Sequence, residues 1–275
     1  MSVKVEKDVV YDKDLDLKLD VYQDPTIPQK GALMDIHGGG WFRGDKAKDA
    51  DISTLFAEHG YLVFTPNYRI APKNTYPAAH VDIQTAVHWI QDSQYDFDRT
   101  KFGVWGSSAG GNLAAEMAIK EHLPAASWSG IFDIDDWLSK HQDIVPHFTQ
   151  TQNFNQASAK IDQTGADDPF YKWFLLNYLT DDPIKIKDAS LVHRIDGDTA
   201  PMLLANSMDE FVPNSGVFQM QEQLLKFNVP VITQFIPGHK HAKGYADQAL
   251  ALTLAFLDKE VGKVASELPE VEAAK

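Results

Sequence analysis

Apolar and polar residues form two kinds of pattern along the chain. Near the start, residues 3–10 and 15–22 alternate between the two, which predicts two antiparallel strands around a polar turn. Further on, short apolar runs alternate with longer segments of helical periodicity. The runs predict strands at 31–36, 61–65, 101–105, 125–130, 201–206 and 230–236, and the longer segments predict helices at 49–59, 78–91, 111–118, 215–227 and 245–260.

This alternation of strand and helix predicts an α/β fold with a mostly parallel sheet and helices on both faces. One segment, residues 132–195, interrupts this alternation, because it has no strand pattern and contains many large aromatic side chains. Because a long loop without structure is unusual in a compact domain, we expect a helical insertion that caps the strand ends. The chain is thus predicted to be a single domain, residues 1–275, with a Glu- and Ala-rich tail at 262–275 that frays.

Composition and charge exclude several classes of function. The 275 residues contain no cysteine, which excludes disulfides, thiolate catalysis and Cys-ligated metals. A net charge of −14 argues against nucleic acid or an anionic membrane as partner. The start of the chain lacks the apolar core of a signal peptide, and no stretch approaches the roughly 20 apolar residues of a membrane span. We therefore expect a cytoplasmic protein.

Residues 106–110 read Gly-Ser-Ser-Ala-Gly and match the G-x-S-x-G nucleophile elbow. A predicted strand precedes them and a predicted helix follows, which is the context that the motif requires. At such a turn the serine, here Ser108, takes a strained conformation that directs its hydroxyl out of the sheet. The alternative is a tight strand-to-helix turn without chemistry.

Residues 37–40 read His-Gly-Gly-Gly and follow a predicted strand directly. They match the HGGG oxyanion loop, whose glycines let backbone N–H groups approach a substrate without side-chain obstruction. We expect Gly39 and Gly40 to donate hydrogen bonds to a developing oxyanion, together with the N–H of Ala109. The alternative is a flexible Gly-rich turn.

A serine hydroxyl needs an adjacent base, and the base needs a carboxylate that fixes its tautomer. Downstream of Ser108, Asp209 follows a predicted core strand and is the preferred acid, with Glu210 as the second candidate. After the last strand stand His239 and His241, which spacing alone does not separate. No pair of histidines has a metal-ligand spacing such as H-E-x-x-H, so no metal or cofactor is predicted.

Taken together, these stretches resemble the α/β-hydrolase superfamily, and within it the carboxylesterases similar to hormone-sensitive lipase and the small bacterial esterases and lipases. The resemblance lies in residues 37–41, 67–72, 106–114 and 237–241. In that family the catalytic histidine stands three residues after the glycine of a Pro-Gly pair, which selects His241. The chain departs from the family pattern at Ser107, where Asp is frequent.

The resemblance implies a serine carboxylesterase for small or short-acyl-chain esters, without a cofactor. Ser108 would attack the carbonyl, His241 would carry the proton and Asp209 would orient His241. A formamidase and an acetyl or feruloyl esterase remain alternatives with the same triad. A non-catalytic ligand-binding protein on a hydrolase fold is the alternative from a different class. The expected partner is a small-molecule ester, and both a monomer and a homo-oligomer remain open.

Large aromatic residues are the candidates for the walls of the substrate pocket, because they offer flat apolar surfaces. One follows the glycine loop and the others lie in the predicted cap. We expect substrate contacts from Trp41, Trp137, Phe154 and Trp173.

Overall fold

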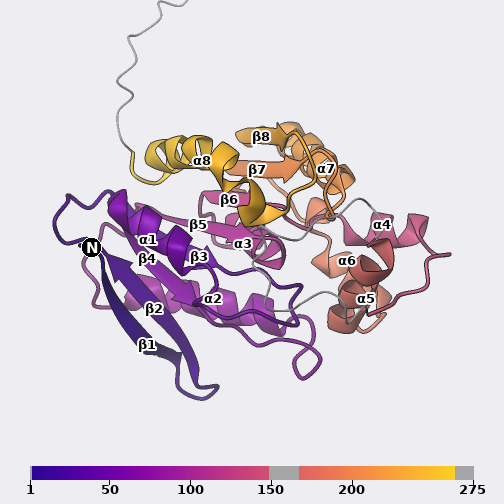
Figure 1. The fold of residues 1–275 in the computed structure, drawn as a ribbon, viewed down its shortest axis with the longest axis horizontal. Coiled ribbons are helices and arrows are strands. Elements are labelled where there is room, and N and C mark those ends of the chain that lie inside the picture. Colours follow the sequence, from indigo (N-terminus) through magenta and orange to yellow (C-terminus); the bar gives the residue numbers. More distant parts are fainter. Residues whose placement is uncertain (1, 149–166, 264–275) are drawn as a thin grey trace, which may run out of the picture.

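The structure is a computed structural model that describes residues 2–148 and 167–263 (Figure 1). An eight-stranded sheet with the order β1-β2-β4-β3-β5-β6-β7-β8 runs through its centre. The strands are β1 (Lys4–Asp12), β2 (Leu17–Gln23), β3 (Gly31–Ile36), β4 (Tyr61–Pro66), β5 (Phe102–Ser107), β6 (Ala125–Trp128), β7 (Met202–Ser207) and β8 (Val231–Ile236).

The sheet is mostly parallel, as the sequence predicts. The strand pairs from β4 through β3, β5, β6 and β7 to β8 are all parallel, whereas β2 pairs antiparallel with both β1 and β4. The predicted hairpin at the start of the chain is therefore confirmed. Because the carboxyl ends of parallel strands share one edge, the loops after β3, β5, β7 and β8 gather there.

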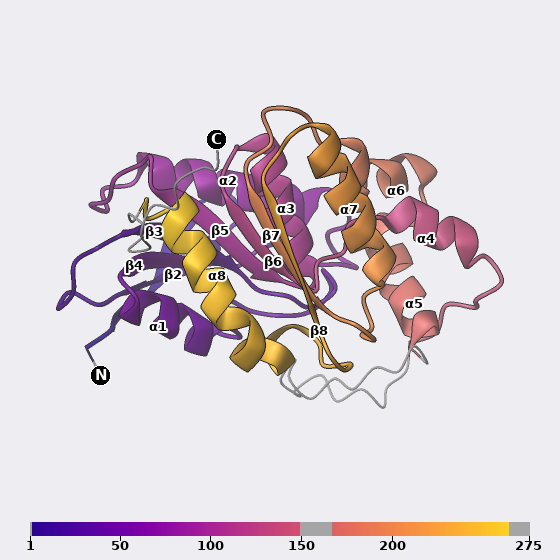
Figure 2. The same ribbon diagram turned by 90° about the horizontal axis from the view of Figure 1, so that it is seen from above.

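Helices cover both faces of the sheet (Figure 2). Residues of α1 and α8 pack on one face with Trp105 and Trp128, and residues of α2, α3 and α7 pack on the other with Val104. Neighbouring residues of β5 thus serve two separate cores, which explains why the strand is buried along its whole length. The helices are α1 (Ala50–Glu58), α2 (Ala78–Asp92), α3 (Ala109–Lys120), α7 (Asn214–Lys226) and α8 (Ala246–Glu260).

The segment between β6 and β7 is helical where the structure describes it, as expected. It forms α4 (Ile134–Lys140), α5 (Asp168–Leu179), α6 (Pro183–Ala189) and the short 3-10 helix η2 (Leu191–His193). These helices stand together beyond the strand ends, on the side of the sheet away from β1 and β2 (Figures 1 and 2). Phe154 and the tail beyond residue 263 lie outside the described residues.

Candidate active site

Ser108 joins β5 to α3 in a strained turn. Its φ of 56° and ψ of −121° are unusual for a residue with a side chain, and such a conformation costs about 1–3 kcal/mol. The neighbouring glycine makes the turn possible, since a Cβ on Gly110 would lie 2.0 Å from the carbonyl oxygen of Ile36. The Ser108 N–H donates to the carbonyl oxygen of Trp128 at 2.8 Å, which ties the turn to β6. The predicted strand–turn–helix context of Ser108 is confirmed.

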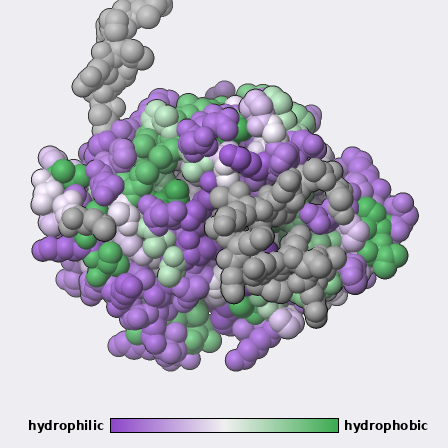
Figure 3. Space-filling model, in the orientation of Figure 1, coloured by the Kyte–Doolittle hydropathy of each residue, from purple (hydrophilic) through white to green (hydrophobic). Residues whose placement is uncertain are grey.

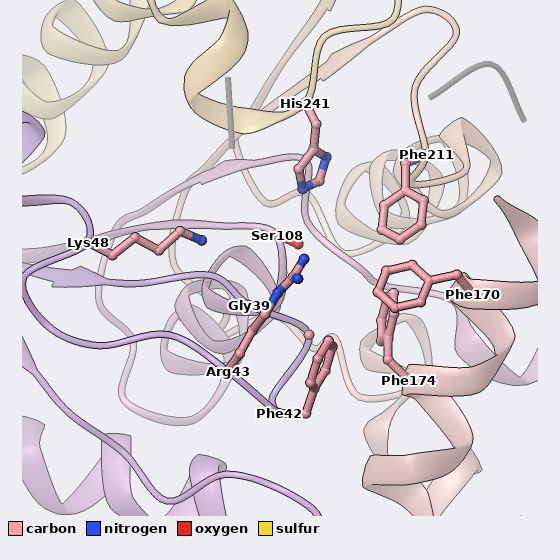
Figure 4. Close-up of a pocket in the computed structure, with 10 residues that line it drawn as sticks. Gly39, Phe42, Arg43, Lys48, Ser108, Phe170, Phe174, Phe211 and His241 are labelled. Carbon is pink, nitrogen blue, oxygen red and sulfur yellow. The ribbon is translucent and has the colours of Figure 1, made fainter. Parts of the chain in front are cut away.

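Ser108 lies in a pocket at the edge of the sheet where the parallel strands end (Figure 4). About 370 Å³ of space in it, including open solvent at its mouth, is free of protein atoms. The described residues that line it come from the glycine loop, the elbow, α5 and the loops after β7 and β8. They are Gly39, Gly40, Phe42, Arg43, Lys48, Ser108, Phe170, Phe174, Phe211 and His241.

His241 follows β8, and its imidazole lies above Ser108 (Figure 4). Its Nδ1 is 2.6 Å from Oε2 of Glu210, and both side chains are buried. The other carboxylate oxygen, Oε1, accepts hydrogen bonds from the hydroxyl of Ser129 at 2.9 Å and the N–H of Ser207 at 2.8 Å. The carboxylate of Glu210 is therefore fixed from two sides. With the proton on Nδ1, the Nε2 of His241 is left as a base.

The prediction that Asp209 pairs with His241 is wrong. Asp209 is exposed, and its backbone N–H donates to the carbonyl oxygen of Gly238 at 3.0 Å. Met208 and Asp209 form the outer part of the turn after β7, and Glu210 is the first residue whose side chain returns to the interior. Glu210, the second candidate in the sequence, occupies the position predicted for Asp209. The α/β-hydrolase chain order allows either residue type, so the motif could not separate them.

The glycine loop lies beside Ser108 as predicted. Gly39 has a φ of 137°, and a Cβ on it would lie 2.0 Å from the carbonyl oxygen of Arg43, so only glycine fits there. His37 anchors the loop: its ring stacks on Tyr68 at 4.3 Å, and the Tyr68 hydroxyl donates to the His37 carbonyl oxygen at 2.8 Å. Burial lowers the pKa of His37 to about 4, so this imidazole is neutral near pH 7.

Ala109, the third predicted oxyanion donor, is the first residue of α3 and is buried. Its N–H is one of the first four of the helix, which have no acceptor within the helix.

Three of the predicted substrate contacts do not line the pocket that holds Ser108. Trp41 is buried and stacks on Tyr178 at 5.0 Å, and Trp137 is buried and stacks on His141 at 4.2 Å. Trp173 is half-buried and lies edge-on against Phe42 at 5.2 Å. Tryptophan has a large apolar surface to bury, and Trp41 and Trp137 bury theirs in the core. The fourth predicted contact, Phe154, lies outside the described residues.

Phenylalanines take the place of these tryptophans in the pocket. Phe170 and Phe174 stand one turn apart on α5, Phe42 follows Trp41, and Phe211 follows Glu210. The ring of Phe211 meets that of His241 edge-on at 5.8 Å. The i, i+4 spacing of Phe170 and Phe174 was the available signal, because such residues share one face of a helix.

Sequence reasoning also missed two cations in the pocket, Arg43 and Lys48. Burial lowers the pKa of both side chains, and for Lys48 Asp49 opposes this effect. Among residues 2–148 and 167–263, no three His, Asp or Glu side chains gather as a metal site would require. Within the same residues, no helix combines the length and the apolarity needed to span a membrane.

The family model for BD-FAE matches residues 19–224 of the 275. The chain belongs to the BD-FAE family. The match runs from β2 to α7 and so includes Ser108, the glycine loop and Glu210, while His241 follows it.

Curated relatives match the chain over part of their length. An arylacetamide deacetylase from Bos taurus is 37% identical over 121 residues, which cover 42% of this chain and 30% of the relative. An arylesterase from Saccharolobus solfataricus is 30% identical over 122 residues, 43% of this chain and 38% of the relative. The chain thus matches less than half the length of these relatives.

Solved structures resemble the chain over nearly its whole length. An esterase from Pyrobaculum calidifontis has a TM-score of 0.74 at 20% identity, covering 94% of this chain and 86% of that one. A solved arylesterase has a TM-score of 0.72 at 18% identity, with 96% and 85% covered. At such identities the likeness concerns the fold, and it confirms the predicted α/β-hydrolase architecture.

Proposed function

We propose that the chain is a serine carboxylesterase in which Ser108, His241 and Glu210 form the catalytic triad. The observation that carries the proposal is the position of the His241 imidazole, which lies above Ser108 while its Nδ1 meets Glu210 at 2.6 Å (Figure 4). In this proposal the nucleophile and the base share one pocket, and the orienting acid contacts the base from a third loop. Relatives named as esterases, among them the arylesterase, support the same class of reaction.

The reaction begins with Ser108. Its Oγ attacks the ester carbonyl while Nε2 of His241 takes the hydroxyl proton. The C–O bond to the alcohol then breaks, and the imidazolium gives this proton to the leaving alcohol. Water next attacks the acyl-enzyme, losing a proton to His241, and the acid departs as Ser108 is protonated again. Glu210 stabilises the imidazolium at each stage because its carboxylate accepts the hydrogen bond from Nδ1.

The tetrahedral intermediates carry a negative oxygen that needs preorganised donors. Gly39 and Gly40 line the pocket beside Ser108, and Ala109 opens α3 next to it. We assign the oxyanion donors to their three backbone N–H groups. The N-terminus of α3 adds a favourable dipole for the same charge.

The apolar part of the substrate lies against Phe42, Phe170, Phe174 and Phe211 in this proposal. Since two of these belong to α5, the insertion between β6 and β7 acts as a cap that shapes the pocket of a single catalytic domain. The limited space of the pocket favours small or short-acyl esters. A compact amide such as a formamide would meet the same catalytic groups, so it belongs in the assay.

The test compares Ser108→Ala with Ser107→Ala on p-nitrophenyl acetate, longer p-nitrophenyl esters and an aryl formamide. Ser107 is the matched control, because it is also buried at the elbow but does not line the pocket. Loss of Ser108 should lower kcat/KM by roughly 10³-fold or more, since triad residues act as a unit. A fluorophosphonate should label Ser108 alone. A wild-type protein that binds esters without turnover and resists labelling would instead be a ligand-binding protein.

A further inference from the structure

The catalytic pocket carries positive charge on a protein that is strongly acidic overall. The chain has 39 acidic and 25 basic residues, and much of the face in Figure 3 is hydrophilic. Yet the described residues that line the pocket include Arg43 and Lys48 and no acidic side chain. Both cations extend toward Ser108 from the segment after the glycine loop (Figure 4). Cations in the pocket of an acidic protein indicate that its ligand carries a negative charge.

Lys48 is one of the cations that line the pocket. Within the described part of the chain its ammonium has no carboxylate within ion-pair distance, although Asp49 is its neighbour in sequence. The buried carboxylate of Asp49 lies 3.5 Å from the ammonium of Lys243, and that of Asp35 accepts from the hydroxyl of Ser53 at 2.5 Å. Lys48 is half-buried, and a cation taken partly out of water is costly unless an anion joins it.

Arg43 lies on the same side of the pocket. Its guanidinium sits 5.1 Å from the ring of Phe42 and 6.0 Å from that of Phe170, so aromatic faces flank it. A planar guanidinium held in this way suits two-point recognition of a carboxylate. Phe174 and Phe211 stand across the pocket from Lys48 (Figure 4). The pocket is therefore cationic on one side and apolar on the other.

We propose that the preferred substrate is an ester that itself carries a carboxylate, bound by Lys48 and Arg43, with its apolar part against the phenylalanines. This inference rests on the proposed esterase function and specifies its substrate class. The carboxylate is unchanged in the reaction, and only the ester bond is hydrolysed. The carboxylate can belong to the acyl group or to the alcohol group of the ester. In either case it lies a few atoms from the carbonyl that Ser108 attacks.

The experiment uses pairs of esters that are similar in size and shape, one with a carboxylate and one without a charge. For the acyl side, monomethyl succinate is compared with methyl levulinate, in which a methyl ketone replaces the carboxylate. For the alcohol side, O-acetyl-lactate is compared with acetoin acetate in the same way. We expect the charged ester to have the higher kcat/KM by about tenfold in at least one pair, with the preference shrinking as salt is added.

Lys48→Met should then reduce this charged-to-neutral ratio by about tenfold, because it keeps most of the side-chain volume and removes the charge. Lys73→Met is the matched control: Lys73 is exposed and does not line the pocket, so the ratio should stay as in the wild type. A ratio near one in both pairs, or a ratio that Lys48→Met leaves unchanged, would overturn the proposal. Equal losses on charged and neutral esters would do so as well, since they would assign Lys48 to the oxyanion.

Two measurements on the wild-type protein keep the result interpretable if Lys48→Met fails to fold. Butanoate should slow the labelling of Ser108 by an uncharged fluorophosphonate more than 2-pentanone does, and equal protection would contradict the proposal. Labelling together with hydrolysis of neutral esters but no preference for charge would refute the substrate class alone. Absence of both labelling and hydrolysis would instead refute the esterase function.

Discussion

Glu210 Oε2 and His241 Nδ1 lie 2.6 Å apart although 31 positions separate the two residues in the chain. Glu210 follows β7 and His241 follows β8, and these strands are parallel neighbours in register, with Ser207 opposite Ile236. The pairing of two adjacent strands thus carries the acid to the base. The catalytic arrangement depends on the sheet and on how far each loop turns back over it.

Glu210→Gln should lower kcat/KM by roughly 10³-fold or more, because an amide cannot stabilise the imidazolium that forms in the reaction. Asp209→Asn is the matched control, since it makes the same change of chemistry one residue earlier on an exposed side chain. It should leave activity within about twofold. Steady-state kinetics on p-nitrophenyl acetate measure kcat/KM for both variants. The opposite ranking of the two variants would restore Asp209 as the acid.

Ser129 should act as a positioning residue for Glu210. Its hydroxyl contacts Glu210 Oε1 at 2.9 Å and the Tyr245 hydroxyl at 2.7 Å, and it accepts from the N–H of Ala242 at 2.9 Å. A hydrogen bond to a charged group contributes about 1.5–3 kcal/mol, so Ser129→Ala should lower kcat by about tenfold or more.

A double-mutant cycle separates positioning from a general loss of stability. In the Glu210→Gln background, Ser129→Ala should add little further loss of kcat, because its target is already impaired. The pH profile of kcat/KM should also move in Ser129→Ala alone. Additive losses with an unchanged profile would assign Ser129 a structural role only.

Most of the fold and part of the site could be predicted from the sequence. Strand and helix periodicity located β3, α2 and α8 to within one residue, because the buried faces of these elements set the pattern. Ser108 was predicted because the elbow is a backbone constraint, visible as glycines at fixed spacing. These features depend on local sterics and on burial, which a single sequence records directly.

The acid and the pocket walls could not be predicted in the same way. In the turn after β7 no periodicity tells which side chain points inward, so Asp209 and Glu210 were equivalent apart from their type. Trp41 and Phe42 are likewise adjacent aromatics, and the φ of 57° at Trp41 helps to send its ring into the core. Which of two adjacent side chains points into the pocket depends on local backbone angles and on tertiary packing. Neither can be read from the sequence alone.

The Phe170 side chain should influence substrate choice. It lines the pocket from α5, so Phe170→Ala should raise the kcat/KM of a bulky acyl ester relative to p-nitrophenyl acetate by about tenfold, through the space it opens. Trp137→Ala is the matched control on α4: it removes a buried aromatic that does not line the pocket. It should cost about 3–5 kcal/mol of stability and leave the ratio of activities unchanged. Equal ratios in both variants would show that the insertion is only structural.

Glu116 of α3 should make the stability of the protein depend on pH in the acid range. Its buried carboxylate is surrounded by Arg194, Lys120 at 2.8 Å and His80 at 3.8 Å. Burial by itself raises the pKa of Glu116, but these neighbours outweigh it and lower the pKa from 4.5 to about 2. A lowered pKa means that the stabilisation is fully present above pH 4.5 and is lost as the pH falls toward 2.

Glu116→Gln leaves the guanidinium of Arg194 without its buried counter-charge, which should reduce the free energy of unfolding by about 3–5 kcal/mol at pH 7. The difference in the free energy of unfolding between the variant and the wild type should narrow between pH 4.5 and pH 3. In this range the Glu116 carboxylate of the unfolded wild-type chain takes up a proton while the native carboxylate stays ionised, which favours unfolding of the wild type. Urea unfolding followed by circular dichroism at pH 7, 5, 4 and 3 measures this, with Glu58→Gln at an exposed position as the control. A difference that stays constant over this range would mean that Glu116 contributes through packing and not through its charge.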